Sequence, residues 1–219
     1  MSVGNRDPGL EQTRERILDE AERLFAELGF AAVSVRQITQ AAQTNIAAVN
    51  YHFGGKDNLY LEVFRQRWLP RARRLTAQLE ALESRGVDSL EEVVRTIAEA
   101  MLLGFTGQEE RVQHSLLIMR EVAKPSAAFD VVVQDALGPF LALMGRMLAK
   151  GLPGLDEQGL KLYCLSVFFQ VLHFNFARNL VSRATGRDYD QAFLARLVEH
   201  ITSFALRGLA GAGPLERKS

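Results

Sequence analysis

Residues 34–56 read SVRQITQAAQTNIAAVNYHFGGK, and this stretch decides the fold of the chain. Ser34, followed three residues later by Gln37, has the spacing of a capping box, which predicts that a short helix begins there. Two polar residues then make a turn too short to be a linker, and Asn45 predicts the N-cap of a second short helix over 46–53. Two glycines end that helix. This order predicts a helix-turn-helix whose second helix enters a DNA groove.

The residues on both sides of this stretch follow a helical pattern. Apolar residues recur at helical spacing over 13–28, and Gly29 ends that helix. A second pattern over 57–82 contains Pro70, where a kink or a break is expected because proline removes a backbone donor. The rest of the chain is predicted to form five helices, over 89–105, 109–123, 126–150, 157–184 and 189–209. No strand-like alternation occurs, so the sequence predicts an all-α fold.

Length and composition leave room for one or two domains. The chain has 219 residues, of which 47% are hydrophobic and 24% charged, an ordinary globular composition. A serine, an arginine and a glycine at 84–86 predict a loop and a domain boundary. After a flexible arm over 1–10 we therefore expect a helix-turn-helix domain over 11–56, a linking helix over 57–84 and a C-terminal helical domain over 85–211.

Several kinds of protein are disfavoured by the sequence. The N-terminus lacks an apolar signal and no run approaches 18 uninterrupted apolar residues, so we expect a cytoplasmic protein without a membrane span. The single Cys164 rules out an internal disulfide and is predicted to be a buried structural thiol. The histidines lack metal-ligand spacing, and neither a phosphate-binding loop nor a nucleophile elbow occurs. We expect no enzyme, metal or cofactor, although a Ser–His site assembled in space stays open.

Charge is distributed unevenly although the formal net charge is zero. Over 31–74 there are seven basic residues against two acidic ones. This local excess is what a DNA-binding end would need, and the alternative is an ordinary solvated helix face. We expect the helix-turn-helix and the arginines after it to supply most of the affinity for DNA.

The second short helix is predicted to present a polar and aromatic face. Val49 and Phe53 lie four residues apart and are expected to face the core. Asn50 can donate and accept together, which suits an adenine edge, and the small or apolar residues before it suit a groove floor. Lys56 can reach a phosphate, as can the two aromatic side chains that end the helix, whose alternative role is helix-end packing. The predicted DNA contacts are Ser34, Thr44, Asn45, Ile46, Ala47, Asn50, Tyr51, His52 and Lys56.

The last two predicted helices are apolar on more than one face. Such a helix is either central in its own bundle or buried on two sides by a partner. A four-helix interface between two copies of the chain is the economical explanation, and a fully internal bundle helix is the alternative. The predicted interface residues are Phe168, Leu172, Phe193, Leu197, Ile201 and Phe204.

Residues 13–60, TRERILDEAERLFAELGFAAVSVRQITQAAQTNIAAVNYHFGGKDNLY, resemble the DNA-binding domain of the TetR family of transcriptional regulators. The matching marks are LFAELGF, then SVRQIT, then NYHF before GGKDNLY. Gln43 stands where many members have glycine, and Asn50 where tyrosine is common. The all-helical remainder, which contains REVAKPSAAFD, is similar to the CecR-like subgroup.

The resemblance implies a homodimeric, ligand-responsive regulator, usually a repressor, on a palindromic operator whose half-sites lie about one DNA turn apart, roughly 34 Å. It also implies that the C-terminal domain binds a small-molecule effector and dimerises. Arg120, Gln170 and His173 stand out there, because polar groups among apolar neighbours need partners. The candidate pocket residues are Met101, Phe105, Leu117, Arg120, Phe129, Phe140, Met144, Phe169, Gln170, His173 and Phe176.

Two hypotheses therefore stand. In the first, the linking helix transmits effector binding to the DNA-reading helix and pivots at Pro70. In the second, the chain is a helical adaptor or small-molecule-binding protein without DNA binding, and residues 34–56 pack against protein.

Overall fold

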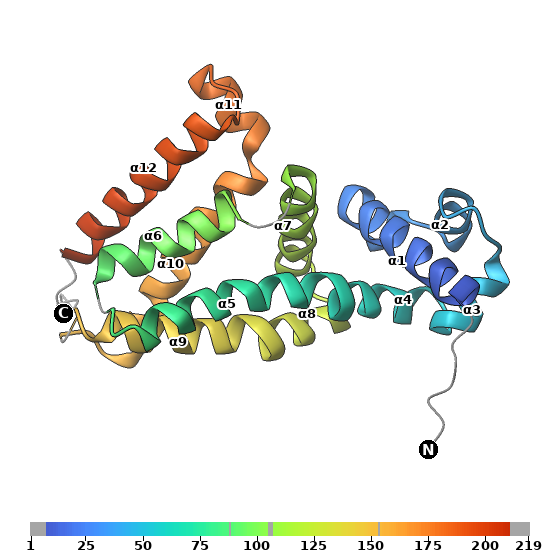
Figure 1. Cartoon of the computed structure of the whole chain (residues 1–219), viewed down its shortest axis with the longest axis horizontal. Coiled ribbons are helices and arrows are strands. Elements are labelled where there is room, and N and C mark those ends of the chain that lie inside the picture. Colours follow the sequence, from blue (N-terminus) through green and yellow to red (C-terminus); the bar gives the residue numbers. More distant parts are fainter. Residues whose placement is uncertain (1–7, 88, 105–106, 153, 211–219) are drawn as a thin grey trace, which may run out of the picture. The chain divides into compact units, whose positions relative to one another are not determined.

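The computed structural model describes residues 8–87, 89–104, 107–152 and 154–210. Every regular element within these ranges is helical, which confirms the predicted fold class (Figure 1). The α-helices are α1 (Pro8–Leu28), α2 (Val35–Ala41), α3 (Ile46–Phe53), α4 (Lys56–Val63), α5 (Leu69–Ser84), α6 (Leu90–Leu102), α7 (Gln108–Ala123), α8 (Ala127–Val132), α9 (Gly138–Ala149), α10 (Glu157–Phe176), α11 (Arg178–Thr185) and α12 (Gln191–Ala210). A 3₁₀ turn (Phe30–Ala32) follows α1, and two π-helical turns, η2 (Phe64–Trp68) and η3 (Val133–Leu137), precede α5 and α9.

The chain packs as two compact units. Unit 1 contains the chain up to Arg71 together with Leu116–Val132, and unit 2 contains Ala72–Ser115 and the residues from Val133 onward. Helices α5 and α7 each belong partly to both units. The predicted division into a helix-turn-helix domain over 11–56, a linking helix over 57–84 and a C-terminal domain over 85–211 concerns function, and it stays a prediction.

Unit 1 is built around α1. Its buried stripe packs against α2, α3 and α4, and α8 packs against α4 and η2. The core side chains recur every three or four residues along each helix, so each helix buries one face. The largest fully buried side chains of this unit are Ile17, Leu18, Phe25, Ile38, Leu59, Phe64 and Leu117.

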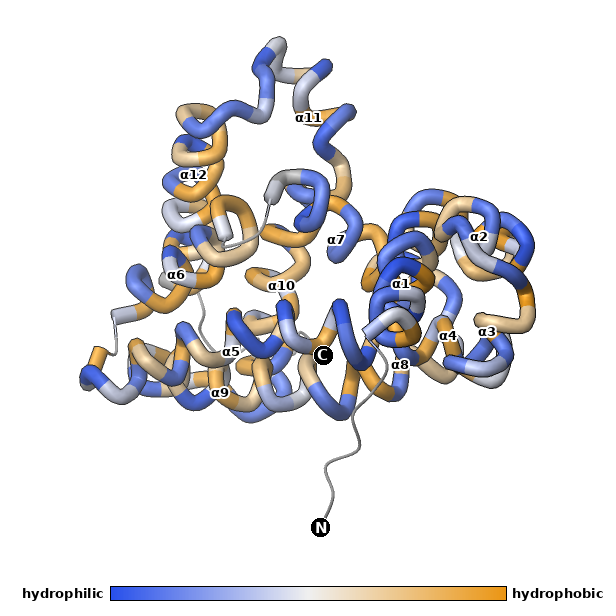
Figure 2. Tube along the Cα trace, turned by 45° about the vertical axis from the view of Figure 1, so that its right-hand side comes forward, coloured by the Kyte–Doolittle hydropathy of each residue, from blue (hydrophilic) through white to orange (hydrophobic). Residues whose placement is uncertain are grey.

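Unit 2 is built around α6, which packs against α10, α12 and α9. Apolar and polar stretches alternate along these helices in the hydropathy view (Figure 2). Its fully buried large side chains are Leu79, Ile97, Leu102, Met144 and Met147. Cys164 is buried here, and burial raises the pKa of its thiol to about 11, so this cysteine is the predicted structural thiol.

Two prolines are accommodated by π-helical turns and do not break their helices. Pro70 is the second residue after η2, and Pro139 is the second residue after η3. In the first case the N–H of Leu69 donates to the carbonyl of Phe64, five residues back. A proline inside a helix lacks a donor and crowds the preceding turn, and the wider turn makes room for it. The helix therefore continues past Pro70, and of the two expected outcomes, a kink or a break, the break does not occur.

Other helix ends differ from the sequence-based expectation. Helix α1 begins at Pro8, so residues 8–10 are not part of a flexible arm, and 1–7 lie outside the described residues. Proline suits a first helical position, because its missing N–H has no helical partner there. The expected helix over 157–184 is two helices, α10 and α11, which meet at Ala177 with a bend of 77°.

Length and composition alone would allow the helical stretch 127–149, or at most also α10 with α11, to cross a membrane. One third of the first stretch's most apolar window is buried within the protein. Apolar core helices of water-soluble proteins have the same length and composition, so this finding weighs little against the expected absence of a span.

Candidate nucleic-acid interface

Helix α2 begins at the predicted capping box. The hydroxyl of Ser34 accepts a hydrogen bond from the backbone N–H of Gln37 at 3.2 Å, and the Gln37 side chain accepts one from the Ser34 N–H at 2.8 Å. Two N–H groups that would lack partners at the helix end are thereby satisfied. Ser34 is exposed, so its position allows DNA contact, although its hydroxyl already serves the cap.

The turn between α2 and α3 requires a left-handed residue. Gln43 has φ of 51°, the only positive φ at a non-glycine residue in the described chain. The next N–H, of Thr44, donates to the carbonyl of Thr39 at 2.9 Å and closes the turn. Glutamine in this conformation carries steric strain that glycine avoids.

We therefore expect Gln43→Gly to raise the free energy of unfolding by about 0.5–1 kcal/mol, the relief of strain outweighing the added freedom of the unfolded chain. Gln40→Gly is the matched control, because Gln40 is exposed within the regular part of α2. There glycine costs about 1 kcal/mol. Urea denaturation is expected to give changes in the free energy of unfolding of opposite sign for the two variants. A loss of stability in Gln43→Gly would contradict the expected strain.

Helix α3 is fixed at both ends by local chemistry. The side-chain oxygen of Asn45 accepts from the N–H of Ala48 at 2.9 Å, and Gly54 ends the helix with φ of 74°. Val49 and Phe53 are buried, as predicted. Their burial fixes the rotation of α3 and leaves its other face toward solvent.

That outward face contains most of the predicted DNA contacts. Tyr51 is 74% exposed and Ile46 is 50% exposed, although both are large apolar or aromatic side chains. Ala47 and Asn50 are exposed between them, while His52 is half-buried and meets Tyr51 edge-on, ring centroids 5.0 Å apart. Exposed apolar groups grouped on one helix face indicate a surface that meets a partner.

Lys56, three residues after the end of α3, is held in place by an aromatic ring. Its Nζ lies 4.2 Å from the centroid of the Phe30 ring, and the residue is half-buried. Phe30 in turn lies 4.9 Å from the ring of Tyr60. A cation held over an aromatic ring keeps its charge and two or three donors toward solvent, so this contact fixes where the ammonium stands.

Two of the five arginines that follow the helix-turn-helix are paired with acids of α1 within unit 1, whereas Arg73 and Arg74 are exposed. Arg67 contacts Glu15 at 2.6 Å and Asp19 at 2.7 Å, and Arg71 pairs with Glu22, so acidic side chains of α1 neutralise them. The excess counted along 31–74 overlooked these partners. Arg36, which is exposed on α2, and Lys56, which comes three residues after α3, are the cations of unit 1 that lie close to α3 in the sequence.

Arg120 has a structural role that the sequence did not indicate. Its Nε donates to the carbonyl of Ala26 at 3.0 Å and its Nη2 to that of Glu27 at 2.6 Å, so it caps the C-terminus of α1. A Cβ on Gly29 would stand 2.8 Å from Arg120 Nη1. Protein carbonyls therefore supply the partners for which an effector was expected, and the assignment of Arg120 to a pocket is corrected.

A buried carboxylate next to Arg120 is the main feature that sequence reasoning missed. Glu121 is 2% exposed; its Oε1 accepts from the hydroxyl of Tyr60 at 2.6 Å, and its Oε2 accepts from the N–H and hydroxyl of Ser126, both at 2.9 Å. Burial, followed by the bond to Glu121, raises the pKa of Tyr60 above its usual range. The only sequence signal was an Arg-Glu pair in a segment assigned to the C-terminal domain.

The predicted pocket residues are divided between the two units. Leu117, Arg120 and Phe129 belong to unit 1, the other described members belong to unit 2, and Phe105 lies outside the described residues. Phe140 and Met144 are buried in the core of unit 2. His173 and Phe176 are exposed, Met101, Phe169 and Gln170 are half-buried, and none of these five lines the pocket described next.

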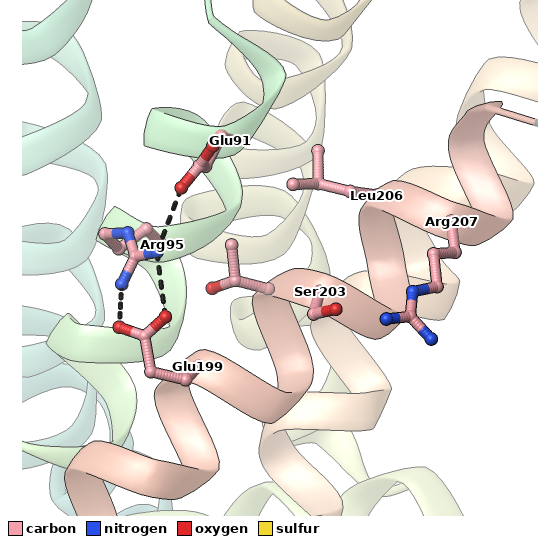
Figure 3. A pocket seen from close by; sticks show the side chains of 7 residues that line it. Glu91, Arg95, Glu199, Ser203, Leu206 and Arg207 are labelled. Carbon is pink, nitrogen blue, oxygen red and sulfur yellow. Dashed lines mark hydrogen bonds and ion pairs between the residues drawn. The ribbon is translucent and has the colours of Figure 1, made fainter.

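Unit 2 has a surface pocket of about 290 Å³ between α6 and α12 (Figure 3). Its lining residues are Glu91, Arg95, Glu199, Thr202, Ser203, Leu206 and Arg207. Arg95 bridges Glu91 at 3.0 Å and Glu199 across the two helices, so its charge is already neutralised. The hydroxyl oxygen of Thr202 is buried without a hydrogen-bond partner among the described residues. A polar, ion-paired floor of this kind is not the apolar effector pocket that was expected.

Four predicted interface residues are buried within the chain itself. Phe168, Leu172, Leu197 and Ile201 are at most 9% exposed, so they fill the core of unit 2 and do not face a partner. Phe193 is half-buried, and Phe204 is 62% exposed. The other exposed large apolar side chains of α10 and α11 are Leu162, Phe176 and Leu180.

Comparison with known sequences assigns both parts of the chain. Residues 17–63 match the model of the bacterial regulatory proteins of the TetR family, and 90–209 match the C-terminal domain of the HTH-type transcriptional dual regulator CecR. The dual regulator CecR of Shigella flexneri is 28% identical over 189 residues, covering 80% of this chain and 81% of that protein. The transcriptional repressor Rv3405c of Mycobacterium tuberculosis is 30% identical over 159 residues, covering 68% and 81%.

Solved structures share the fold. A TetR-like transcriptional regulator from Rhodococcus sp. RHA1 has a TM-score of 0.64 with 18% identity, covering 91% of this chain and 97% of that one. HlyIIR, a hemolysin II transcriptional regulator, has a TM-score of 0.61 with 22% identity, covering 88% and 98%. An N-terminal helix-turn-helix followed by a helical bundle is thus the architecture of this chain.

Proposed function

Since the chain belongs to the TetR family of transcriptional regulators and has a CecR-type C-terminal domain, we propose that it is a ligand-responsive repressor. In this proposal it binds a palindromic operator as a homodimer in the cytoplasm and releases the operator when a small molecule binds. The observation that carries the proposal is the outward face of α3, where Ile46, Asn50 and Tyr51 are exposed while Val49 and Phe53 are buried.

The proposed reader is α3 in the major groove. Ala47 lets the backbone approach the groove floor, Ile46 meets a thymine methyl, and Asn50 pairs with the N6 and N7 of adenine. Tyr51, His52 and Lys56 reach phosphates, with the ammonium of Lys56 positioned by Phe30. Thr44 and Asn45 add the free amides at the start of α3, which favour a phosphate.

The homodimer is proposed to form through exposed apolar side chains of unit 2. Phe204 on α12 and Leu162 and Phe176 on α10 are between 46% and 62% exposed, which is costly for an isolated chain in water. Two copies related by a two-fold axis would bury these side chains and present two α3 helices to the two half-sites.

Effector binding is proposed to act through helices shared by both units. Helix α5 is one such helix, and its pivot in this proposal is Pro70, which follows the π-helical turn η2. Helix α7 is the other, because its last turn holds α1 through Arg120 and α4 through Glu121. A hundredfold change in operator affinity requires a coupling free energy of about 2.7 kcal/mol. If Pro70→Ala leaves operator affinity and effector response unchanged, α5 is not the pivot.

We expect Asn50→Ala and Lys56→Ala to weaken DNA binding in different ways. Asn50→Ala relaxes preference at one base position per half-site, with a loss of about 1–3 kcal/mol on the preferred sequence. Lys56→Ala weakens all sequences about equally and reduces the salt dependence by about one phosphate contact per protomer. Salt-titrated binding of each variant to preferred and scrambled duplexes gives both quantities.

The decisive experiment is selection of bound sequences from a random DNA pool at fixed salt. A palindrome with half-sites about one turn apart, roughly 34 Å, supports both DNA reading and the homodimer. An absence of enrichment, with neither variant changing DNA affinity, favours the alternative function of a helical adaptor that lacks DNA binding.

A further inference from the structure

Arg16, on α1, contacts the helix-turn-helix from the helix that precedes it. Helix α1 packs against both α2 and α3 (Figure 1). The Nε of Arg16 donates to the carbonyl of Ala42, the C-cap of α2, at 3.3 Å. Its Nη2 donates to the hydroxyl of Thr13 at 3.4 Å, and its Nη1 has no hydrogen-bond partner among the residues that the structure describes. Arg16 is exposed, so its guanidinium is held beside the α2–α3 turn with donors left over.

The charge of Arg16 is not neutralised by the acids of its own helix. Asp19 and Glu20 lie one turn further along α1, where each could reach Arg16. Asp19 instead pairs with Arg67 at 2.7 Å. Glu20 pairs with Arg23 at 2.8 Å. No carboxylate of the described chain lies within ion-pair distance of Arg16, so its positive charge is left for another partner.

Three cations without a carboxylate partner in the described chain surround the helix-turn-helix. Arg36 lies in the first turn of α2, Arg16 contacts the last residue of α2, and Lys56 follows α3. The acids of α1 neutralise Arg67 and Arg71, so these two add little positive field. Free positive charge thus remains at both ends of α2 and after α3, and a polyanion that lies against these helices would be attracted to all three positions.

We propose that Arg16 contacts a phosphate of the DNA next to the start of α3. The inference rests on the proposed function, and it adds a DNA contact from outside the helix-turn-helix. Ala42 is three residues before Asn45, the N-cap of α3. The five donors of a guanidinium point in different directions within one plane, so Nη1 can donate to a phosphate oxygen while Nε stays on the carbonyl of Ala42. Because that carbonyl already orders the side chain, less conformational entropy is lost on binding.

The test is the salt dependence of DNA binding by the full chain. Fluorescence anisotropy is measured with two duplexes, the one enriched in the operator selection and one of random sequence. Arg16→Gln removes the charge and is expected to reduce the slope of log affinity against log salt by about 0.9 per protomer on both duplexes. The affinity falls about fivefold per protomer at physiological salt, and the loss shrinks as the salt concentration rises. Arg16→Lys keeps the charge and is expected to keep the slope.

Lys124→Gln is the matched control. Lys124 is also an exposed cation of unit 1 without a carboxylate partner in the described chain, but it follows α7 and lies outside the helix-turn-helix. Its replacement is expected to leave the slope unchanged. Thermal unfolding checks that all three variants are folded, and an exposed position such as Arg16 is expected to change the Tm little.

Two results would overturn the proposal. One is an unchanged slope in Arg16→Gln while Lys56→Ala reduces it, which leaves the proposed function standing. The other is a loss of affinity in Arg16→Gln that is equal at every salt concentration, which means that Arg16 only positions the α2–α3 turn. If the unchanged chain binds neither duplex, the proposed function fails and this contact fails with it.

Discussion

Glu121→Leu is expected to lower the free energy of unfolding by about 3 kcal/mol and to weaken operator binding. The leucine fills the volume but accepts nothing, so the hydroxyl of Tyr60, in a residue 4% exposed, loses its acceptor. The N–H and hydroxyl of Ser126 lose theirs as well, but Ser126 is exposed, so water can replace that acceptor and the main cost falls on the buried hydroxyl of Tyr60. Each buried donor left without a partner costs about 1–3 kcal/mol. Denaturant unfolding measures the loss, and Glu80→Leu, at an exposed position of α5, is the control with little expected effect.

Tyr60→Phe tests the same contact from the other side. Combined with Glu121→Leu it should cost clearly less than the two single changes added together, because both changes remove the same hydrogen bond.

The raised pKa of Tyr60 also predicts how the free energy of unfolding changes at alkaline pH. The folded protein disfavours the phenolate, so stability present below the usual pKa of about 10 is lost as the pH rises above it, by up to about 1.4 kcal/mol per pH unit. Tyr60→Phe should lose stability less steeply there, and parallel curves would show that this phenol is not protected.

Losing the contact between Tyr60 and Glu121 is expected to lower operator affinity as well as stability, for a geometric reason. Tyr60 lies on α4, four residues after Lys56, and its ring packs against Phe25 and Phe30, at 4.9 Å from each. Phe30 supports the ammonium of Lys56. Freeing Tyr60 therefore loosens the base of the proposed DNA-reading face. Full operator affinity in a folded Glu121→Leu protein would mean that α7 does not position this face.

The helix-turn-helix was predictable because its signals are local. The capping box of Ser34 with Gln37, the N-cap Asn45 and the left-handed Gly54 each involve residues within four positions of one another. Burial of Val49 and Phe53 followed from helical spacing alone. The positive φ of Gln43 is the exception, since the sequence there lacks the glycine that usually indicates a left-handed residue.

What could not be predicted depends on partners distant in sequence. The acids of α1 that neutralise Arg67 and Arg71 lie about fifty positions earlier, so a count of charge along 31–74 cannot include them. The carbonyls that Arg120 caps lie more than ninety positions away. Helix α10 is apolar on several faces because α6, α9 and α12 surround it, and this internal burial explains Phe168 and Leu172 without a second copy.

Arg71→Met is expected to lower the free energy of unfolding by about 3–5 kcal/mol, more than any other single charge removal in unit 1. Arg71 pairs with Glu22 through its two terminal guanidinium nitrogens, Nη1 and Nη2, and the side chains are 14% and 5% exposed. Methionine keeps most of the volume but leaves a buried carboxylate without its counter-charge, which is the costly outcome. Denaturant unfolding gives the value, with the dependence on denaturant concentration checked for two-state behaviour.

Arg67→Met, one helical turn earlier, is the matched control. Arg67 also bridges to α1, but the side chains of its partners Glu15 and Asp19 are 41% and 63% exposed. Water can solvate these two carboxylates once the cation is removed, so the expected cost is at most about 1 kcal/mol. The double change Glu22→Leu with Arg71→Met should recover most of the loss, since neither charge then remains buried. Equal costs for Arg71→Met and Arg67→Met, or no recovery in the double variant, would show that burial of Glu22 does not set the strength of the α1–α5 connection.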